Sequence, residues 1–270
     1  RQMCIRDSLE ATNQETSENI NPEKSEKEEY NPINYKKQSG MWFTYMEYQD
    51  ILYNKTESEF TESIKSRLVQ AADMGINTVY IHVIAFNDCC YKSDIFPQAD
   101  YYSGNYDALE ITLNEAHKLG LSVHAWLNPL RCQTDEQMKK LDTDFQIKKW
   151  YDDSQKNGTY IVKLKDRWYL NPAYDEVRSY IASGAAEIVR NYKVDGIHID
   201  DYFYPTSETE FDADAFSESG SSDLDKWRIE NINLMVSSIY DAVKSENKEI
   251  QFGISPVSYT HLTLPTNSRV

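Results

Sequence analysis

The stretch that decides the fold is Val194-Asp-Gly-Ile-His-Ile-Asp-Asp-Tyr-Phe-Tyr-Pro205. Side chains alternate along a β-strand, so one face would carry Gly196, His198, Asp200 and Tyr202, and the other Ile197, Ile199, Asp201 and Phe203. Pro205 has no N–H to donate to a sheet, so the strand should end near it. A strand that is apolar at its start and polar only at its carboxyl end is typical of α/β enzymes, in which the strand ends face the ligand.

Working outward, strands and helices alternate along the chain. Four further segments have the composition of strands, at residues 41–47, 76–84, 121–127 and 250–254. Helical periodicity lies between them, at residues 57–74, 106–119, 171–192 and 223–244. The third and fourth strands are separated by an insertion, which contains a charged helical stretch at 135–151 and a hairpin at 160–170.

This alternation predicts a parallel sheet of right-handed βα units. A dinucleotide-binding sheet would carry a glycine-rich turn after its first strand, and the sequence has none there. The predicted fold is therefore α/β, a (β/α)8 TIM barrel. A complete barrel takes about 250 residues, so we expect this one to be truncated after about five βα units.

The two ends of the chain differ from its centre. Residues 1–38 are polar and charged, and we expect a disordered, partly non-native segment and linker. Residues 39–256 form the predicted partial barrel domain. Residues 1–8 and 257–270 resemble translated sequencing-adapter sequence, so 257–270 is expected to be a non-native tail.

Composition excludes several classes of partner. Acidic residues outnumber basic ones by 44 to 28, which gives a net charge of −16 and argues against binding to nucleic acid or an anionic membrane surface. No run of about 18 apolar residues is present, so no transmembrane segment is predicted. We expect no cofactor and no metal site, because the four cysteines show no Cys-x-x-Cys spacing. Cys132 is instead predicted to lie near Cys89 or Cys90, where a disulfide would fit an exported protein.

Long motifs carry a resemblance to a known family. They are Glu115–Arg131, Trp168–Pro172, the quoted stretch and Phe252–Pro256. With them the chain resembles the glycosyl hydrolase-like 10 family, whose members are mostly bacterial envelope proteins, over roughly residues 41–256. That family is similar in turn to the α-amylase clan of TIM-barrel glycosidases. The resemblance implies a glycoside hydrolase acting on a bacterial glycan, with peptidoglycan strands as the implied substrate, located outside the cytoplasm at the cell envelope.

The resemblance also assigns roles to residues. His198 falls at the position of the clan's inward Arg, Asp200 at its nucleophilic Asp, and Asn128 at the Asn that ends its third strand. There are two departures. The family's second-strand Arg corresponds to Ile84, and the clan's acid/base Glu on strand five has no counterpart in residues 252–256.

The predicted site therefore centres on carboxylates at strand ends. Asp200 and Asp201 are the predicted catalytic residues, with Asp200 as nucleophile or stabiliser of an oxocarbenium-like transition state. Asp201 points the other way and also fits a role in supporting the loop. Substrate contacts are predicted for His124, Asn128, His198, Tyr202, Tyr204, Glu47 and Asp88. Among these, Glu47 and Asp88 follow the first and second strands, where a proton donor can be placed.

Each of these residues also has a structural interpretation. Asp200 can be a strand-end acid bonded to a loop, the histidines can be core residues, and the tyrosines can pack at the rim. The departures from the clan favour an alternative function, a non-catalytic carbohydrate-binding TIM barrel of the cell envelope. A purely structural envelope protein is the third alternative, and convergence of polar residues at strand ends argues against it.

Overall fold

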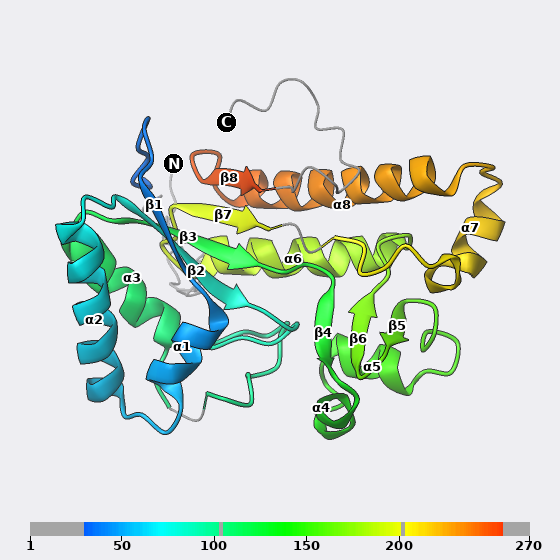
Figure 1. Ribbon diagram of the computed structural model, residues 1–270, viewed down its shortest axis with the longest axis horizontal. Coiled ribbons are helices and arrows are strands. Elements are labelled where there is room, and N and C mark those ends of the chain that lie inside the picture. The colour runs from blue at the N-terminus through cyan, green and yellow to red at the C-terminus, as the bar shows by residue number, and fades with distance from the viewer. Residues whose placement is uncertain (1–29, 103–104, 201–202, 256–270) are drawn as a thin grey trace, which may run out of the picture.

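A computed structural model describes residues 30–102, 105–200 and 203–255 of the chain (Figure 1). Its main sheet contains β1 (Gly40–Phe43), β2 (Thr78–Ile84), β3 (Ser122–Leu127), β7 (Gly196–Ile199) and β8 (Gln251–Ile254). The strands are parallel and stand in the order β1-β2-β3-β7-β8, so each is next to its successor among the sheet strands. This sequential order is that of a (β/α) barrel, and the predicted partial barrel is confirmed.

Helices connect the strands and cover one side of the sheet. They are α1 (Tyr45–Leu52), α2 (Glu57–Asp73), α3 (Ala108–Lys118), α6 (Asp175–Asn191) and α8 (Leu224–Glu246). In α2 the fully buried residues are Phe60, Ile64, Leu68 and Ala71, at the three- and four-residue spacing of an amphipathic helix. In Figure 1, α2 and α3 lie side by side at one end of the sheet, and α6 and α8 pair at the other.

The two faces of the sheet separate apolar from polar side chains, as the period-2 pattern predicts. On the helix side, Ile197 and Ile199 are fully buried. On the opposite, inner face, the Tyr80 ring lies 4.7 Å from the His198 ring, and His124 occupies space beside Gly196. A Cβ on Gly196 would lie 2.5 Å from Nδ1 of His124, so only glycine fits beside this imidazole.

A second, antiparallel sheet is built from the insertion after β3. It contains β4 (Arg131–Thr134), β6 (Arg167–Leu170) and β5 (Ile161–Leu164), in the order β4-β6-β5, together with α4 (Asp135–Lys140) and α5 (Gln146–Asp152). The predicted hairpin is confirmed, with Leu164 paired to Arg167 across a turn in which Lys165 has φ of 58°. Figure 1 shows this sheet beyond the carboxyl end of β3, where it borders the strand ends.

The first strand is shorter than predicted. It ends at Phe43, and Thr44 and Glu47 form a capping box that starts α1. Glu47 is therefore not a strand-end carboxylate, and that prediction is wrong. The segment between β7 and α8 contains a 3-10 turn, Thr209–Phe211, and α7 (Ala213–Ser219).

Residues 30–38 were predicted to belong to a disordered linker, and they instead pack against the amino ends of the strands. The Tyr30 hydroxyl and the Ile33 N–H both donate to Oδ1 of Asp195, at 2.7 and 2.6 Å, and the Tyr35 hydroxyl donates to the Gly120 carbonyl at 2.6 Å. Composition alone missed this, because the partners lie far along the chain. The predictions for residues 1–29 and for the tail after Pro256 lie outside the described residues.

Cys132 forms no disulfide with Cys89 or Cys90, and their proximity stays a prediction. Cys89, Cys90 and Cys132 are buried free thiols, and they pack in the hydrophobic core. In the part of the chain that the structure describes, no helix combines the length and apolarity needed to cross a bilayer.

Candidate functional site at the carboxyl ends of the strands

Two residues, Asn128 and Asp200, follow adjacent strands at one level of the sheet. Leu127 pairs with Ile199, and Ile199 with Ile254, so the next residues, Asn128 and Asp200, are neighbours by register. Asp200 is partly exposed, whereas Asn128 is buried. The Asn128 amide donates to the Ala85 carbonyl at 3.4 Å, and its Oδ1 has no hydrogen-bond partner among the described residues. The pair thus offers a carboxylate and an unsatisfied amide oxygen at the edge where a barrel binds its ligand.

Imidazoles form the layer beneath this edge. His198 and His124 lie on the inner face, as predicted, and His82 of β2 joins them, with its ring stacked 3.8 Å from Trp126. Burial lowers the pKa of His82 to about 3 and the pKa values of His124 and His198 to about 4, so all three are neutral at pH 7. Each ring keeps at least one nitrogen without a partner in the described part of the chain. His82 was missed by sequence reasoning, although alternation from Tyr80 places it on the same face.

A tight turn after β2 presents two more side chains to the edge. Cys89 forms an antiparallel bridge back to Ile84, so the four residues between them make the turn. Asn87 has φ of 59° there, a left-handed conformation that asparagine tolerates, and its Oδ1 accepts from the Tyr180 hydroxyl at 2.8 Å. The turn is therefore fixed, and it carries Phe86 and Asp88.

Asp88 is a buried carboxylate with little compensation. It is 3% exposed, and Oδ1 accepts one hydrogen bond, from the Phe86 N–H at 3.2 Å. Burial raises its pKa to about 7; the charge of Asp100 acts in the same direction, while the backbone hydrogen bond and Arg167 oppose it. A carboxyl that titrates near neutrality can hold a proton and give it up, which general acid catalysis requires.

A cleft of about 260 Å³ opens beside Asp88. Its lining combines aromatic rings, acids, amides and one guanidinium, contributed by Tyr45, Gln49, Tyr53, Phe86, Asp88, Asp100, Tyr101, Gln137 and Arg167. The Tyr45 ring contacts both His82, at 5.7 Å, and Phe86, at 4.8 Å, so the cleft adjoins the imidazole layer.

Two further predicted site residues, Glu47 and Tyr204, make structural contacts. Glu47 accepts from the N–H and hydroxyl of Thr44 at the start of α1, which is a capping role. Tyr204 packs its ring edge against Phe211, 5.8 Å between centroids, and lies under the Arg228 guanidinium at 5.0 Å. Asp201 and Tyr202 fall outside the described residues, so their roles stay predictions.

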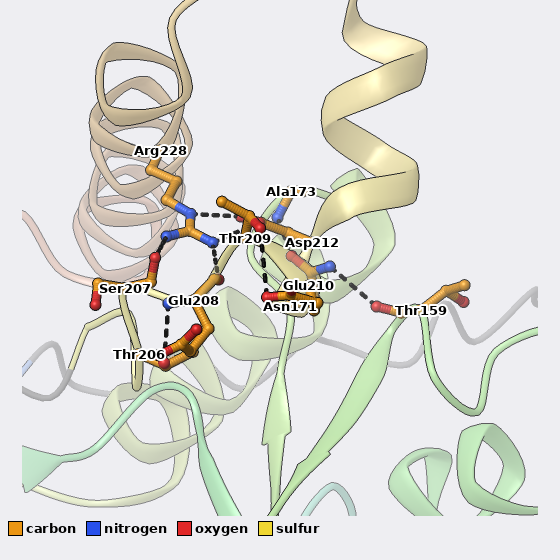
Figure 2. Close-up of polar contacts among 10 residues, drawn as sticks. All are labelled: Thr159, Asn171, Ala173, Thr206, Ser207, Glu208, Thr209, Glu210, Asp212 and Arg228. Carbon is orange, nitrogen blue, oxygen red and sulfur yellow. Dashed lines mark hydrogen bonds and ion pairs between the residues drawn. The ribbon is translucent and has the colours of Figure 1, made fainter.

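The loop that follows β7 is anchored to α8 by Arg228, as Figure 2 shows. Its guanidinium donates to both Asp212 oxygens, at 2.9 and 2.6 Å, and to the carbonyls of Ser207 and Glu208, at 3.2 and 2.7 Å. Arg228 and Asp212 are both buried, so the pair fixes the loop downstream of Asp200. Sequence reasoning missed this pair because the two residues sit in different elements, 16 positions apart.

The described part of the chain offers no candidate site for a metal ion. Within residues 30–102, 105–200 and 203–255, no group of three or more His, Cys, Asp or Glu side chains is placed to hold an ion.

The fold and the strand-end carboxylates define a class, the glycosidase-like (β/α) barrels. A profile of the family described as "Glycosyl hydrolase-like 10" matches residues 37–267, and the chain belongs to this family. The match runs past Pro256 into the predicted non-native tail, whose origin stays a prediction.

Curated relatives agree with this assignment. The chain is 32% identical over 196 residues to "Glycosyl hydrolase YngK" of Bacillus subtilis, covering 68% of this chain and 37% of the relative. It is also 32% identical over 203 residues to "Glycosyl hydrolase DigH" of Escherichia coli K12, covering 68% and 44%. The chain thus spans about two-fifths of the length of these relatives.

Two solved structures share the fold. The "PgaB (BpsB) glycoside hydrolase domain from Bordetella bronchiseptica" superposes with a TM-score of 0.53 at 10% identity, over 80% of this chain and 64% of that one. "Alpha-L-fucosidase isoenzyme 2 from Paenibacillus thiaminolyticus" gives a TM-score of 0.50 at 12% identity, over 72% and 29%. At these identities the likeness concerns the fold alone.

Proposed function

We propose that this chain carries part of the active site of a glycoside hydrolase that acts on a bacterial glycan, with peptidoglycan strands as the substrate. One observation carries the proposal. Two carboxyl groups in different environments, partly exposed Asp200 and buried Asp88, follow strands of one barrel sheet at its carboxyl edge. Glycosidases use two carboxyl groups, one ionised and one able to hold a proton.

The roles follow from these environments. Asp200, as a carboxylate, would stabilise or attack the sugar carbon that becomes positive as the glycosidic bond breaks. Asp88, with its pKa raised to about 7 by burial, would hold the proton that the leaving oxygen needs. Asn128 and the neutral rings beneath would accept and donate hydrogen bonds to sugar hydroxyls. Asp201 remains a proposed supporting carboxylate.

The test is hydrolysis of peptide-free glycan strands, with product release measured by chromatography. Because the chain spans about two-fifths of its relatives, the full-length relative is assayed in parallel, with the substitution at its matching position. Asp200→Asn keeps the shape and removes the charge, so we expect turnover to fall by at least about 10²–10³-fold. The exposed Asp241→Asn, on the outer helix α8, is the matched control. Near-normal turnover of Asp200→Asn, or greater damage from Asp201→Asn, would contradict these roles.

A second candidate function is carbohydrate binding without catalysis. It is favoured by β8, Gln251–Ile254, which offers no carboxyl at the clan's acid/base position. Glycan strands that bind to the full-length relative without being cleaved would support carbohydrate binding without catalysis. The proposed location outside the cytoplasm rests on the family resemblance, and the three buried thiols add no disulfide to support it.

A further inference from the structure

The cleft beside Asp88 has a chemical character that the proposed hydrolysis does not use. Tyr45 and Tyr53 line it from α1 and the residue that follows this helix, and Tyr53 is 58% exposed. Aromatic rings with an exposed face are suited to packing on a sugar ring. At about 260 Å³ the cleft is slightly smaller than the roughly 300–1,000 Å³ pockets of drug-sized ligands, so it suits a single ring.

Arg167 is the cation of this cleft. Its guanidinium lies 4.1 Å from the centre of the Phe86 ring, and it donates to the Cys132 carbonyl at 2.8 Å. These two contacts fix the plane of the guanidinium. Among the described residues, no carboxylate lies within ion-pair distance of Arg167, although the chain has a net charge of −16. A second guanidinium, that of Arg131, lies 4.7 Å from the same ring.

The acids of the cleft do not cancel this positive charge. Asp88 is buried against the Phe86 N–H, and its pKa of about 7 leaves it largely protonated in mildly acidic solution. Asp100 is exposed and accepts from the Gln137 amide at 2.9 Å. A monoanionic group beside Arg167 is therefore tolerated, whereas a dianion would be repelled more strongly by Asp100.

We propose that this cleft binds one sugar ring bearing a carboxylate, which Arg167 holds through charge-assisted hydrogen bonds while Tyr45 and Tyr53 pack on the ring. Arginine presents a rigid fork of N–H donors that matches a carboxylate. The inference rests on the proposed function, in that the ring would belong to the glycan that the strand-end carboxylates cleave. It goes beyond it by naming an acidic sugar as the unit bound on the β2 side of the site.

The test is a binding titration of the full chain at pH 6, monitored by NMR. Glucuronate and N-acetylmuramate are the acidic probes. Glucose and N-acetylglucosamine are the neutral counterparts. We expect both acidic sugars to bind about 10- to 100-fold more tightly than their neutral counterparts, since a hydrogen-bonded charge contributes on this scale. Arg167→Gln should remove the preference and leave glucose binding unchanged, and Arg167→Lys should keep part of it. Arg190→Gln, at an exposed arginine paired with Glu246, should bind as the wild type does.

Three outcomes would overturn the inference. They are equal binding of acidic and neutral sugars by the wild type, an unchanged preference in Arg167→Gln, and tighter binding of glucose 6-phosphate than of glucuronate. Glucose binding by Arg167→Gln shows that the cleft has folded in this variant. If the variant does not fold, the relative affinity of the wild type for acidic and neutral sugars tests the inference. Failure of the proposed function is read separately. If the chain shows the Arg167-dependent preference and the full-length relative cleaves no glycan strands, the sugar-binding inference stands and the proposed hydrolase function is wrong.

Discussion

Two buried aspartates at opposite ends of the sheet show how position separates stability from chemistry. Asp195, at the amino end of β7, is fully buried and accepts four hydrogen bonds, from the Tyr30 hydroxyl, His117 Nε2 and the N–H groups of Ile33 and Val123, at 2.6–2.9 Å. Asp88, beyond the carboxyl end of β2, is as deeply buried and accepts one, from the Phe86 N–H. The carboxylate with many donors holds three segments of the chain together, whereas burial raises the pKa of the one with few donors to about 7.

The largest effect is expected at Asp195. Asp195→Ala would leave buried donors on three segments without an acceptor, so we expect a loss of about 3–5 kcal/mol in the free energy of unfolding, measured by urea titration. Asp88→Asn is the matched variant, and at pH 7 it should be neutral or stabilising. A loss below about 1 kcal/mol for Asp195→Ala would show that the donors find water or other partners.

The ion pair of Arg228 and Asp212 fixes the loop at the carboxyl end of the sheet, and its removal should lower the free energy of unfolding somewhat less. Arg228→Met leaves the buried Asp212 carboxylate unpaired, and we expect a loss of about 2–4 kcal/mol together with lower glycan turnover, because the loop after Asp200 is released. The double variant Arg228→Met/Asp212→Leu should recover most of the stability and little of the turnover. Recovery of both would mean that the loop position does not matter.

The pH dependence of the free energy of unfolding reports the environment of Asp88. The native pKa of Asp88 is raised to about 7 from 3.8, so its contribution to stability is full below about pH 4 and is lost as the pH rises through 7. Asp88→Asn should therefore gain stability over the wild type with rising pH, by roughly 1–3 kcal/mol at pH 8. The buried histidines, with lowered pKa values, make stability rise with pH. Their contribution is the same in the wild type and in Asp88→Asn, so it cancels when the two curves of stability against pH are subtracted. A difference that is flat from pH 4 to 8 would contradict the assigned environment.

The smallest effect separates two tyrosines of the segment 30–38. Tyr30→Phe removes a donor to the Asp195 carboxylate, and Tyr35→Phe removes a donor to the Gly120 carbonyl. Hydrogen bonds to charged groups contribute about 1.5–3 kcal/mol and neutral ones about 0.5–1.5, so Tyr30→Phe should cost about 1 kcal/mol more. Equal losses of stability in thermal unfolding would mean that the hydrogen bond to Asp195 contributes no more than the one to the Gly120 carbonyl.

Local pattern was enough for most of the fold. The alternation in 194–200, the helical spacing of Phe60, Ile64 and Leu68, and the hairpin at 160–170 depend on neighbours in the sequence, and the structure confirms them. The short helix α1 also had a local signal, the Thr44…Glu47 capping box, which the aromatic residues around it obscured. The partial barrel was likewise predictable, because the family motifs span it.

The site was predictable in place but not in environment. Strand-end position identified Asp200, Asn128 and Asp88, since the carboxyl edge is a property of topology. The partners of Asp195 and of Arg228 come from segments brought together only by folding, up to 165 positions apart. The same holds for the burial that raises the pKa of Asp88, because it depends on how loops pack.

The segment 30–38 has a consequence for the order of folding. Its contacts reach the far part of the chain, as Asn34 donates to the Glu249 carbonyl and Asn247 donates to the Tyr30 carbonyl, across more than 200 positions. During synthesis this segment leaves the ribosome early, yet its partners at 195 and 247–249 emerge much later. Closing so long a loop is entropically costly before the strands between are in place. Docking of the segment would thus be a late step. It would connect the start of β1 to the region before β8 after the main sheet has formed.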